Sequence, residues 1–392
     1  MNPKLRTFLC LAVVGVVTVG RGAPAPLTAE EIRDGWIRLF DGNTLFGWAP
    51  REAGEWTVED GVIVSLPGKG TGLLSTTTEF ADFELQLEFW VTGKANSGVF
   101  LRCATEGLIT AGNATEVNIC DDHRRWPTGS INEVAQSAGP VSTVDRWNHY
   151  QITAVGDLFT VRLNGQTTVE AQDPRFRRGT IALQRFDDQG EIRFRNVKLR
   201  PLGLQSLFNG RDLAGWKEIP NRKSVYSVTP EGWLNVKDGN GDLQSEGVYG
   251  DFVLQLDIIS NGQHLNSGVF FRAIPGEFWS GYESQIRNQW EGDDRTRPVD
   301  FGTGGIYNRQ PARRVVSTDG EWFTKTIVAH GRHMAVWVDG YQVSDWTDDR
   351  PPHENARQGY RAEPGVISLQ GHDPTTDLSF RSLRIVEFPS VR

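Results

Sequence analysis

The strongest constraint on this chain is an internal repeat, because blocks of its N-terminal half return in the same order in its C-terminal half. The paired blocks are residues 39–48 with 207–216, 82–87 with 251–256, and 96–102 with 266–272. Repetition of this kind indicates two copies of one domain. The copies stay in step except in loops, and the largest excess of residues falls in the second copy, around Asp348 to Pro364.

The repeat also sets the domain boundaries. Each copy of roughly 170 residues is long enough to bury its own hydrophobic core. We expect the first domain over residues 29–201 and the second over residues 205–390. Pro201 and Gly203 interrupt the strand pattern between them, which favours a boundary at this place. The connection is short, so we expect the two domains to touch.

Most of the chain has the pattern of strands and turns. Residues 84–89 and 191–195 alternate polar and apolar side chains, which is the period of a strand with one buried face. The Asn-Gly pair at 164–165 and the Asp-Gly pair at 339–340 supply the positive-φ residues of tight hairpins. Many antiparallel strands at this spacing predict an all-β fold, with two sheets packed face to face in each domain.

One short helix is expected before the first strand. Thr28 and Glu31 have the spacing of a capping box, in which the two side chains satisfy free amides of a first helical turn. This predicts a helix from Ala29 to about Gly35.

The N-terminal segment has the layout of an export signal. Lys4 and Arg6 precede an apolar stretch over residues 8–19, which is shorter than a membrane span requires, and a segment rich in Gly, Ala and Pro follows. We therefore interpret residues 1–25 as a signal peptide and expect an exported protein, periplasmic or secreted. An uncleaved N-terminal anchor is the alternative.

The charge balance argues against nucleic acid as a partner. The chain has 41 Lys and Arg against 49 Asp and Glu, a formal net charge of −8, and no basic run of the kind that neutralises phosphates. Beyond the export signal, nothing in the sequence indicates contact with a membrane.

Two cysteines lie in the predicted mature chain, Cys103 and Cys120. An oxidising compartment would permit a disulfide between them. Strand alternation favours free thiols instead, because Cys103 points away from the face that carries Arg102, whereas Cys120 shares a face with Asn118.

Polar side chains that recur in the repeat are the candidates for ligand binding. Glu116 and Asn118 lie two residues apart, as do Glu283 and Gln285, so each pair emerges on one face of a strand. Each copy also has an arginine at the end of its third block, Arg102 or Arg272. We expect these guanidinium groups to face a ligand, with a salt bridge at the rim as the alternative. Carboxylate, amide and guanidinium groups together suit the hydroxyls of sugars.

The second copy adds groups for acid–base chemistry. His372 follows Gln370 in a Leu-Gln-Gly-His motif, and Tyr307 ends a Gly-Gly-Ile-Tyr motif. The first copy has Phe186 where His372 falls, and Asn132 or its neighbours in place of Tyr307.

A divalent metal is an alternative use of His, Glu and Asn side chains. The sequence has no His-x-x-x-His or Cys-x-x-Cys spacing, and the aspartate pairs at 121–122 and 293–294 are typical of solvated turns. We therefore predict no metal and no other cofactor. The repeated blocks offer no second acid near Glu283 or Glu116, which weakens a two-carboxylate mechanism of glycoside hydrolysis.

Together these motifs resemble a known family, the 3-keto-disaccharide hydrolase domain, once called a domain of unknown function. The motifs are Leu-Phe-Asp-Gly-x-x-Leu-x-Gly-Trp, Asp-Phe-x-Leu-x-Leu, Asn-Ser-Gly-Val-Phe-x-Arg, Glu-x-Gln-Ile, Gly-Gly-Ile-Tyr and Leu-Gln-x-His, and they cover nearly everything from Glu30 to Phe388. The resemblance implies a concanavalin-like jelly-roll sandwich in each domain, a bacterial envelope or secreted setting, and activity on glycosides whose sugar carries a ketone at C3.

Carried over residue by residue, the resemblance fits the second copy better. There it implies catalytic roles for His372, Glu283 and Arg272, and substrate binding by Asn266, Gln285, Tyr307, Gln370 and Asn288, the last standing where the family often has an acid. In the first copy it implies substrate binding by Asn96, Arg102, Glu116, Asn118, Asp121 and Gln184. Without the His and Tyr, the first copy is interpreted as a partner or binding domain.

The implied chemistry follows from the ketone, which acidifies the C2 proton. A base, either His372 or Glu283, removes this proton while Arg272 stabilises the enolate and the C1 oxygen departs, and water addition completes net hydrolysis. A non-catalytic, lectin-like carbohydrate-binding protein is the alternative, and a purely structural envelope protein is a third. The extra loop around Asp348 to Pro364 is expected to form a lip over the second site.

Overall fold

The computed structural model describes residues 26–139, 141–355 and 357–390, so the segment interpreted as a signal peptide lies outside the described residues. The expected helix is present as α1 (Ala29–Arg33). Its capping box is formed, because the Thr28 hydroxyl accepts from the Glu31 amide at 3.1 Å and the Glu31 carboxylate accepts from the Thr28 amide at 2.7 Å. None of the helices in the described part of the chain is long and apolar enough to cross a membrane.

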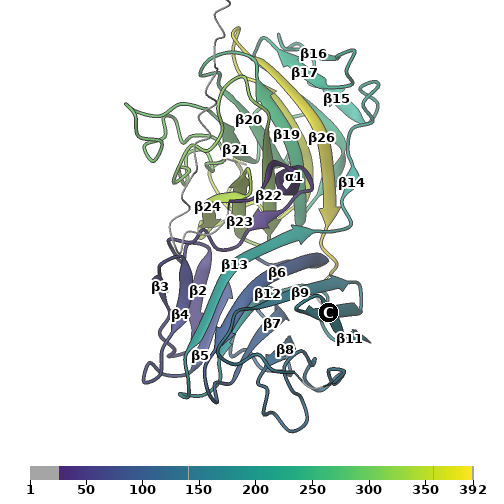
Figure 1. Cartoon of the computed structure of the whole chain (residues 1–392). Coiled ribbons are helices and arrows are strands. Elements are labelled where there is room, and N and C mark those ends of the chain that lie inside the picture. The colour runs from purple at the N-terminus through teal and green to yellow at the C-terminus, as the bar shows by residue number, and fades with distance from the viewer. Residues whose placement is uncertain (1–25, 140, 356, 391–392) are drawn as a thin grey trace, which may run out of the picture.

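The N-terminal half forms one antiparallel β-sandwich (Figure 1). Its strands are β1 (Ile37–Arg38), β2 (Trp48–Arg51), β3 (Thr57–Glu59), β4 (Val62–Ser65), β5 (Gly72–Thr76), β6 (Phe83–Val91), β7 (Ser97–Cys103), β8 (Thr115–Ile119), β9 (Asn148–Val155), β10 (Leu158–Leu163), β11 (Gln166–Gln172), β12 (Thr180–Arg185) and β13 (Ile192–Pro201). The larger sheet has the order β11-β10-β9-β6-β13-β4-β3, with β1 paired to β13. The smaller sheet has the order β2-β5-β12-β7-β8.

The C-terminal half repeats this architecture. Its strands are β14 (Gln205–Ser206), β15 (Trp216–Glu218), β16 (Val225–Val228), β17 (Leu234–Lys237), β18 (Gly241–Tyr249), β19 (Phe252–Ser260), β20 (Ser267–Ala273), β21 (Tyr282–Ile286), β22 (Phe323–His330), β23 (His333–Val338), β24 (Tyr341–Thr347), β25 (Gly365–Gly371) and β26 (Asp377–Glu387). The larger sheet has the order β16-β17-β26-β19-β22-β23-β24, with β14 paired to β26, and the smaller has the order β15-β18-β25-β20-β21. The strand order is therefore the same in both domains, and the predicted all-β tandem fold is confirmed.

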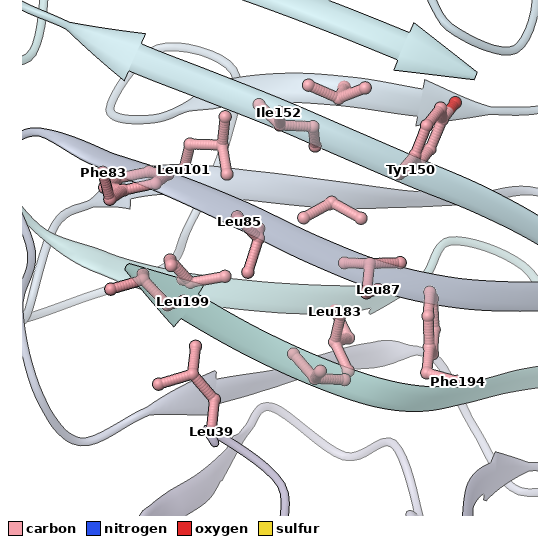
Figure 2. Close-up of a cluster of buried hydrophobic side chains, with 14 of the residues drawn as sticks. Leu39, Phe83, Leu85, Leu87, Leu101, Tyr150, Ile152, Leu183, Phe194 and Leu199 are labelled. Carbon is pink, nitrogen blue, oxygen red and sulfur yellow. The ribbon is translucent and has the colours of Figure 1, made fainter. Parts of the chain in front are cut away.

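Each core lies between the inner faces of its two sheets. In the first domain, alternate residues of β6 point inward, among them Leu85 and Leu87, and they are almost fully buried. Figure 2 shows them facing Leu101 and Leu183, which come from strands of the smaller sheet. Burial of such side chains stabilises a fold by about 25 cal/mol for each Å² of apolar surface removed from water.

Both predicted hairpins are present. Asn164 and Gly165 have φ angles of 51° and 83°, and Asp339 and Gly340 have φ angles of 47° and 72°. These left-handed conformations are those of a type I′ turn, which explains why Gly follows Asn or Asp at both sites. The turns connect β10 to β11 and β23 to β24.

The two domains share a contact surface near α1. Trp337 of the second domain belongs to the buried cluster of the first domain, and its indole N–H donates to the Arg38 carbonyl at 2.9 Å. The Gln255 amide donates to the Gly35 carbonyl at 2.8 Å, and Arg313 forms an ion pair with Asp41 at 2.8 Å. The residues that follow β26 also contact the first domain, where the Arg178 guanidinium lies over the Phe388 ring, 5.7 Å from its centre.

Cys103 and Cys120 are both free thiols in the structure. Cys103 is fully buried, and burial raises the pKa of its thiol to about 12. The expectation of free thiols is therefore confirmed, and no disulfide joins these two residues.

Candidate functional site

The smaller sheet of the second domain carries a polar hollow of about 190 Å³. Glu283 and Gln285 alternate along β21 and so emerge on the same face, as their spacing predicts. Gln370 reaches the hollow from β25, which is separated from β21 by β20. His372 follows directly after β25. The predicted site residues that line this one hollow are Asn266, Glu283, Gln285, Tyr307, Gln370 and His372.

A second, larger hollow of about 890 Å³ adjoins the first, and the two share Phe278, Trp279, Glu283 and Tyr307. One wall of the larger hollow comes from the extra loop of the second copy, which contributes Arg350, Glu354, Asn355, Arg357 and Gln358. The described part of this loop thus lies at the second site, where the sequence comparison of the two copies located it. A combined opening of this size suits a small oligosaccharide.

His372 is oriented by the residue that follows it. Its Nδ1 lies 2.8 Å from an oxygen of Asp373, and its Nε2 lies 3.3 Å from the side-chain amide nitrogen of Asn266. The carboxylate accepts a hydrogen bond from the Nδ1–H group, which leaves Nε2 as the unprotonated nitrogen beside Asn266. The pair therefore has the arrangement of a base held in one tautomer by a carboxylate.

Glu283 is the buried acid of the site, with 4% of its surface exposed. Burial raises the pKa of Glu283 to about 7, although the nearby Arg357 guanidinium opposes the shift. Arg357 donates to a Glu283 oxygen at 3.0 Å and lies over the Trp279 ring, 4.1 Å from its centre. Near neutral pH, Glu283 therefore exists in both protonated and ionised forms.

The structure adds charged residues that the sequence analysis missed. Asp242 on β18 is buried opposite Gln370, accepts the Trp279 amide at 2.8 Å, and has its pKa raised by burial to about 6. Asp300 accepts from the side-chain amides of Gln285 at 3.1 Å and Asn266 at 3.2 Å. These contacts hold the amide groups that line the hollow.

Lys325 lies beneath the site and was also missed. Its ammonium nitrogen is fully buried and donates to the backbone carbonyls of Ser284 at 3.2 Å and Gln285 at 2.8 Å. Burial lowers the pKa of Lys325 to about 7, and the negative charge of Glu283 opposes that shift. A signal was present in the sequence, because Lys325 is in phase with the inward residues Phe323 and Ile327 of β22.

The prediction that Arg272 faces the ligand is wrong. Its side chain is 1% exposed and lies away from both hollows, donating to the carbonyls of Gly250 at 2.9 Å and Gly331 at 2.7 Å and to the Asp251 carboxylate at 3.0 Å. The physical reason is a bulge in β20, where the register shifts between Phe270 and Ala273 and Arg272 adopts a φ of 48°. Simple alternation therefore fails at the end of this strand.

Arg102 repeats this arrangement in the first domain, and the prediction of ligand binding is wrong there too. It is 1% exposed, has a φ of 51°, and donates to the Ala81 and Gly156 carbonyls and to Asp82 at 3.0 Å. The repeated arginine is thus the partner of the repeated aspartate. Both residues recur because they close the same structural contact.

Asn288 and Asp121 do not line the hollows of their domains either. Asn288 accepts from the hydroxyls of Thr303 and Ser317, and Asp121 accepts from those of Thr128 at 2.6 Å and Thr143 at 2.7 Å. An amide oxygen and a carboxylate oxygen serve equally well as acceptors here. The assignment of both residues to substrate binding is therefore corrected to loop anchoring.

The remaining predicted residues of the first domain meet at a hollow of about 640 Å³ on its own smaller sheet. These residues are Asn96, Glu116, Asn118 and Gln184. Asn132 donates to Glu116 at 2.6 Å, and burial raises the pKa of Glu116 to about 7. Across the described residues of the chain, no group of three or more His, Cys, Asp or Glu side chains is arranged to hold a metal ion.

Several known proteins are similar to parts of this chain. A 3-keto-disaccharide hydrolase from Bacteroides thetaiotaomicron is 38% identical over 79 residues, which is 17% of this chain and 27% of the relative, so the match spans about a quarter of that protein. A candidate glycosyl hydrolase structure from Parabacteroides distasonis is 21% identical, with a TM-score of 0.40, over 45% of this chain and 98% of that one. The carbohydrate-binding module CBM66 from Bacillus subtilis is 21% identical, with a TM-score of 0.32, over 39% of this chain and 95% of that one.

The family comparison covers both domains. The family described as the 3-keto-alpha-glucoside-1,2-lyase-like domain matches residues 35–200 and again residues 203–386. Each match spans one β-sandwich, including its smaller sheet and the hollow on it. The chain therefore belongs to the 3-keto-alpha-glucoside-1,2-lyase-like domain family, of which it carries two copies.

Proposed function

We propose that the second domain cleaves the glycosidic bond of 3-keto-glycosides by removing the C2 proton, expelling the C1 oxygen and then adding water. The observation that carries this proposal is the presence of a carboxylate-held imidazole, His372 with Asp373, and a buried acid, Glu283, on the wall of one hollow. Family membership supports carbohydrate as the substrate class.

The first step is proton transfer to His372. A ketone at C3 acidifies the C2 proton, because its electron pair is delocalised onto the ketone oxygen as an enolate. Asp373 accepts a hydrogen bond from the Nδ1–H group, so the lone pair on Nε2 accepts the C2 proton, and Asn266 beside it orients the ring. Of the two groups that the sequence left open as the base, His372 is therefore the one proposed here.

The second step is departure of the C1 oxygen. The enolate re-forms the ketone, a C1–C2 double bond forms, and the bond from C1 to the glycosidic oxygen breaks. Glu283, with a pKa raised by burial to about 7, is protonated in part at neutral pH and donates its proton to the leaving oxygen. Addition of water then completes net hydrolysis: the water oxygen bonds to C1 and loses a proton to Glu283, and His372, which is 41% exposed and exchanges its proton with solvent, protonates C2.

Arg357 supplies the cation that the sequence analysis assigned to Arg272. It contacts Glu283, and its other terminal nitrogen, Nη1, is buried without a hydrogen-bond partner among the described residues. An unused donor next to the acid suits the negative charge that develops on the ketone oxygen.

The direct test is turnover of a 3-keto-glucoside such as 3-keto-trehalose by the His372→Ala variant. Loss of the base is expected to lower kcat by about 10²–10⁴-fold, because general base catalysis contributes that much. Binding of the substrate is expected to persist, since the amide groups remain. Full turnover by this variant would remove the proposed mechanism.

A lectin-like function without catalysis is the second candidate. The observation that favours it is a set of buried amide oxygens at the hollow, those of Asn266, Gln285 and Gln370, which have no hydrogen-bond partner among the described residues. Sugar hydroxyls would satisfy them. Saturable binding of 3-keto-trehalose without any product in mass spectra would favour this reading over the enzyme.

The proposal includes export, on the basis of Lys4, Arg6 and the apolar residues 8–19. Expression of the full chain in a Gram-negative host, followed by fractionation and mass determination of the N-terminus, tests it. A shortened chain in the periplasm or medium is expected, and a full-length chain in the cytosol would contradict export.

A further inference from the structure

The first-domain hollow retains the recognition groups of the second. Strand pairing sets Glu116 opposite Phe100 and Asn118 opposite Gly98, just as it sets Glu283 opposite Phe270 and Gln285 opposite Gly268. Gln184 and Asn96 likewise match Gln370 and Asn266 at the two hollows. The carboxylate and the three amides that face a saccharide are therefore present twice.

The proposed base and several other titratable groups of the second site are replaced in the first hollow, as strand register shows. Phe186 stands at the place of His372, and Leu73, opposite Gln184, stands at the place of Asp242, opposite Gln370. Asn132 takes the place of Tyr307, since the backbone amide of each donates at 2.9 Å to the carbonyl of the site glutamate, Glu116 or Glu283.

The buried cation is replaced as well. The Tyr150 hydroxyl donates to the Asn118 carbonyl at 2.7 Å, which is the contact that Lys325 makes with Gln285 in the second domain. The first copy also lacks the extra loop that supplies Arg357. Of the two groups that the proposed mechanism uses to move protons, His372 and Glu283, only Glu283 has a titratable counterpart in the first hollow, Glu116.

His123 is an imidazole on the wall of the first hollow, but its orientation is that of a donor. Its Nδ1 accepts the Trp126 backbone amide at 2.8 Å, which leaves the proton on Nε2. This is the reverse of His372, whose Nδ1 faces a carboxylate. His123 is thus suited to donate to a hydroxyl oxygen and not to remove a carbon-bound proton.

Two further observations indicate a ligand in the first hollow. The Phe186 side chain is 61% exposed on its wall, where it offers an aromatic face for the C–H side of a sugar ring. The buried oxygens of Gln184 and Asn132 have no hydrogen-bond partner among the described residues, and hydroxyl donors would satisfy them.

We propose that the first-domain hollow is a second saccharide-binding site, which holds a neutral sugar through its amides, Glu116 and Phe186 and does not cleave it. The choice of a saccharide of the same class as the substrate rests on the function proposed for the second domain. The first copy thus binds glycan, and the second copy cleaves it.

The experiment is isothermal titration of the full chain with trehalose, maltose and sucrose as neutral probes. Wild-type protein is expected to bind at least one of them at two sites per chain. A Glu283→Gln, His372→Ala double variant is expected to keep the first-domain site with unchanged affinity. Phe186→Ala is expected to weaken that site about tenfold, because an aromatic contact of this kind is worth on the order of 1 kcal/mol or more.

Leu108→Ala is the matched control, because Leu108 is an exposed apolar side chain of the first domain that does not line the hollow. It is expected to bind like the wild type. Abolition of all binding in the double variant, or identical binding by Phe186→Ala and wild type, would overturn the inference. Full turnover of 3-keto-trehalose by the double variant would instead overturn the proposed function and leave the first-domain site in place.

Discussion

Some residues recur in both copies because they line a hollow, and others recur because they hold the fold together. Only the structure distinguishes the two groups. Glu116 and Glu283 line hollows, whereas Arg102 and Arg272 are buried partners of Asp82 and Asp251. Sequence spacing correctly predicted that each glutamate shares a strand face with the amide two residues on, since two-residue alternation holds along a regular strand. It misassigned the arginines because a bulge with a positive φ reverses the side-chain direction, and neither feature has a sequence signature as plain as alternation.

The buried arginines predict a loss of stability when they are replaced. Arg272→Met and Arg102→Met are each expected to lower the free energy of unfolding by about 3 kcal/mol, because each removes a buried guanidinium from carbonyls and a carboxylate. Urea denaturation measures this, and the two variants serve as matched controls for each other. An Arg272→Met protein of unchanged stability that has lost turnover would contradict the structural role and restore the catalytic one.

Glu116 predicts a pH dependence of stability. Its pKa is raised by burial from an ordinary value of 4.5 to about 7 in the folded protein, so its contribution to stability is fully present below pH 4.5 and is lost as pH rises through 7. The side chain in Glu116→Gln stays neutral at every pH, so this variant does not lose stability as pH rises through 7. Thermal unfolding is expected to show the variant stabilised by roughly 1–3 kcal/mol relative to wild type at pH 8, with little difference at pH 4. An equal difference at both pH values would contradict the raised pKa.

At the scale of elements, the second domain differs from the first chiefly in the loop around residues 348–364. The excess length was visible in the sequence, and so was its assignment to the second copy. The sequence did not show that Arg357 is the loop residue that contacts Glu283, because nothing in it pairs these two residues, which lie 74 residues apart along the chain. The strands and the two hairpins were predictable, since period-two alternation and Asn-Gly or Asp-Gly turns are local signals.

The loop predicts a shift of the pH profile. Arg357 lowers the pKa of Glu283 against the larger effect of burial, so Arg357→Gln is expected to raise that pKa further. Because Glu283 acts as an acid, the alkaline limb of kcat against pH is expected to move to higher pH, while kcat itself falls by about 10–100-fold through loss of charge stabilisation. Glu363→Gln, on an exposed residue of the same loop, serves as the control and is expected to leave the limb in place. An unmoved limb in Arg357→Gln would show that Arg357 does not act through Glu283.

The whole molecule is two sandwiches joined through a shared apolar contact. Two domains and their all-β fold were predictable, because the repeat and the alternation each span the whole chain. The sequence predicted that the two domains touch but not which residues make the contact, since Trp337 has the pattern of any inward residue of a strand. The structure shows it buried in the first domain's core cluster, with its indole bound to Arg38.

This junction predicts coupled unfolding of the two domains. Trp337→Ala is expected to lower stability by about 3–5 kcal/mol, because it leaves a large cavity and removes a hydrogen bond. Calorimetry is expected to show a single transition in the wild type and two separate transitions in the variant. Two transitions already present in the wild type, unchanged by the substitution, would contradict the coupling.

Removal of a proton from C2 by the second domain can be followed by isotope incorporation. Turnover of 3-keto-trehalose in D₂O, followed by NMR and mass spectrometry of the released keto sugar, reports whether C2 has exchanged its hydrogen. Deuterium is expected at C2 at the rate of cleavage with the wild type, and none above the enzyme-free background with His372→Ala. Cleavage that leaves protium at C2 would show direct displacement at C1 and would contradict the mechanism.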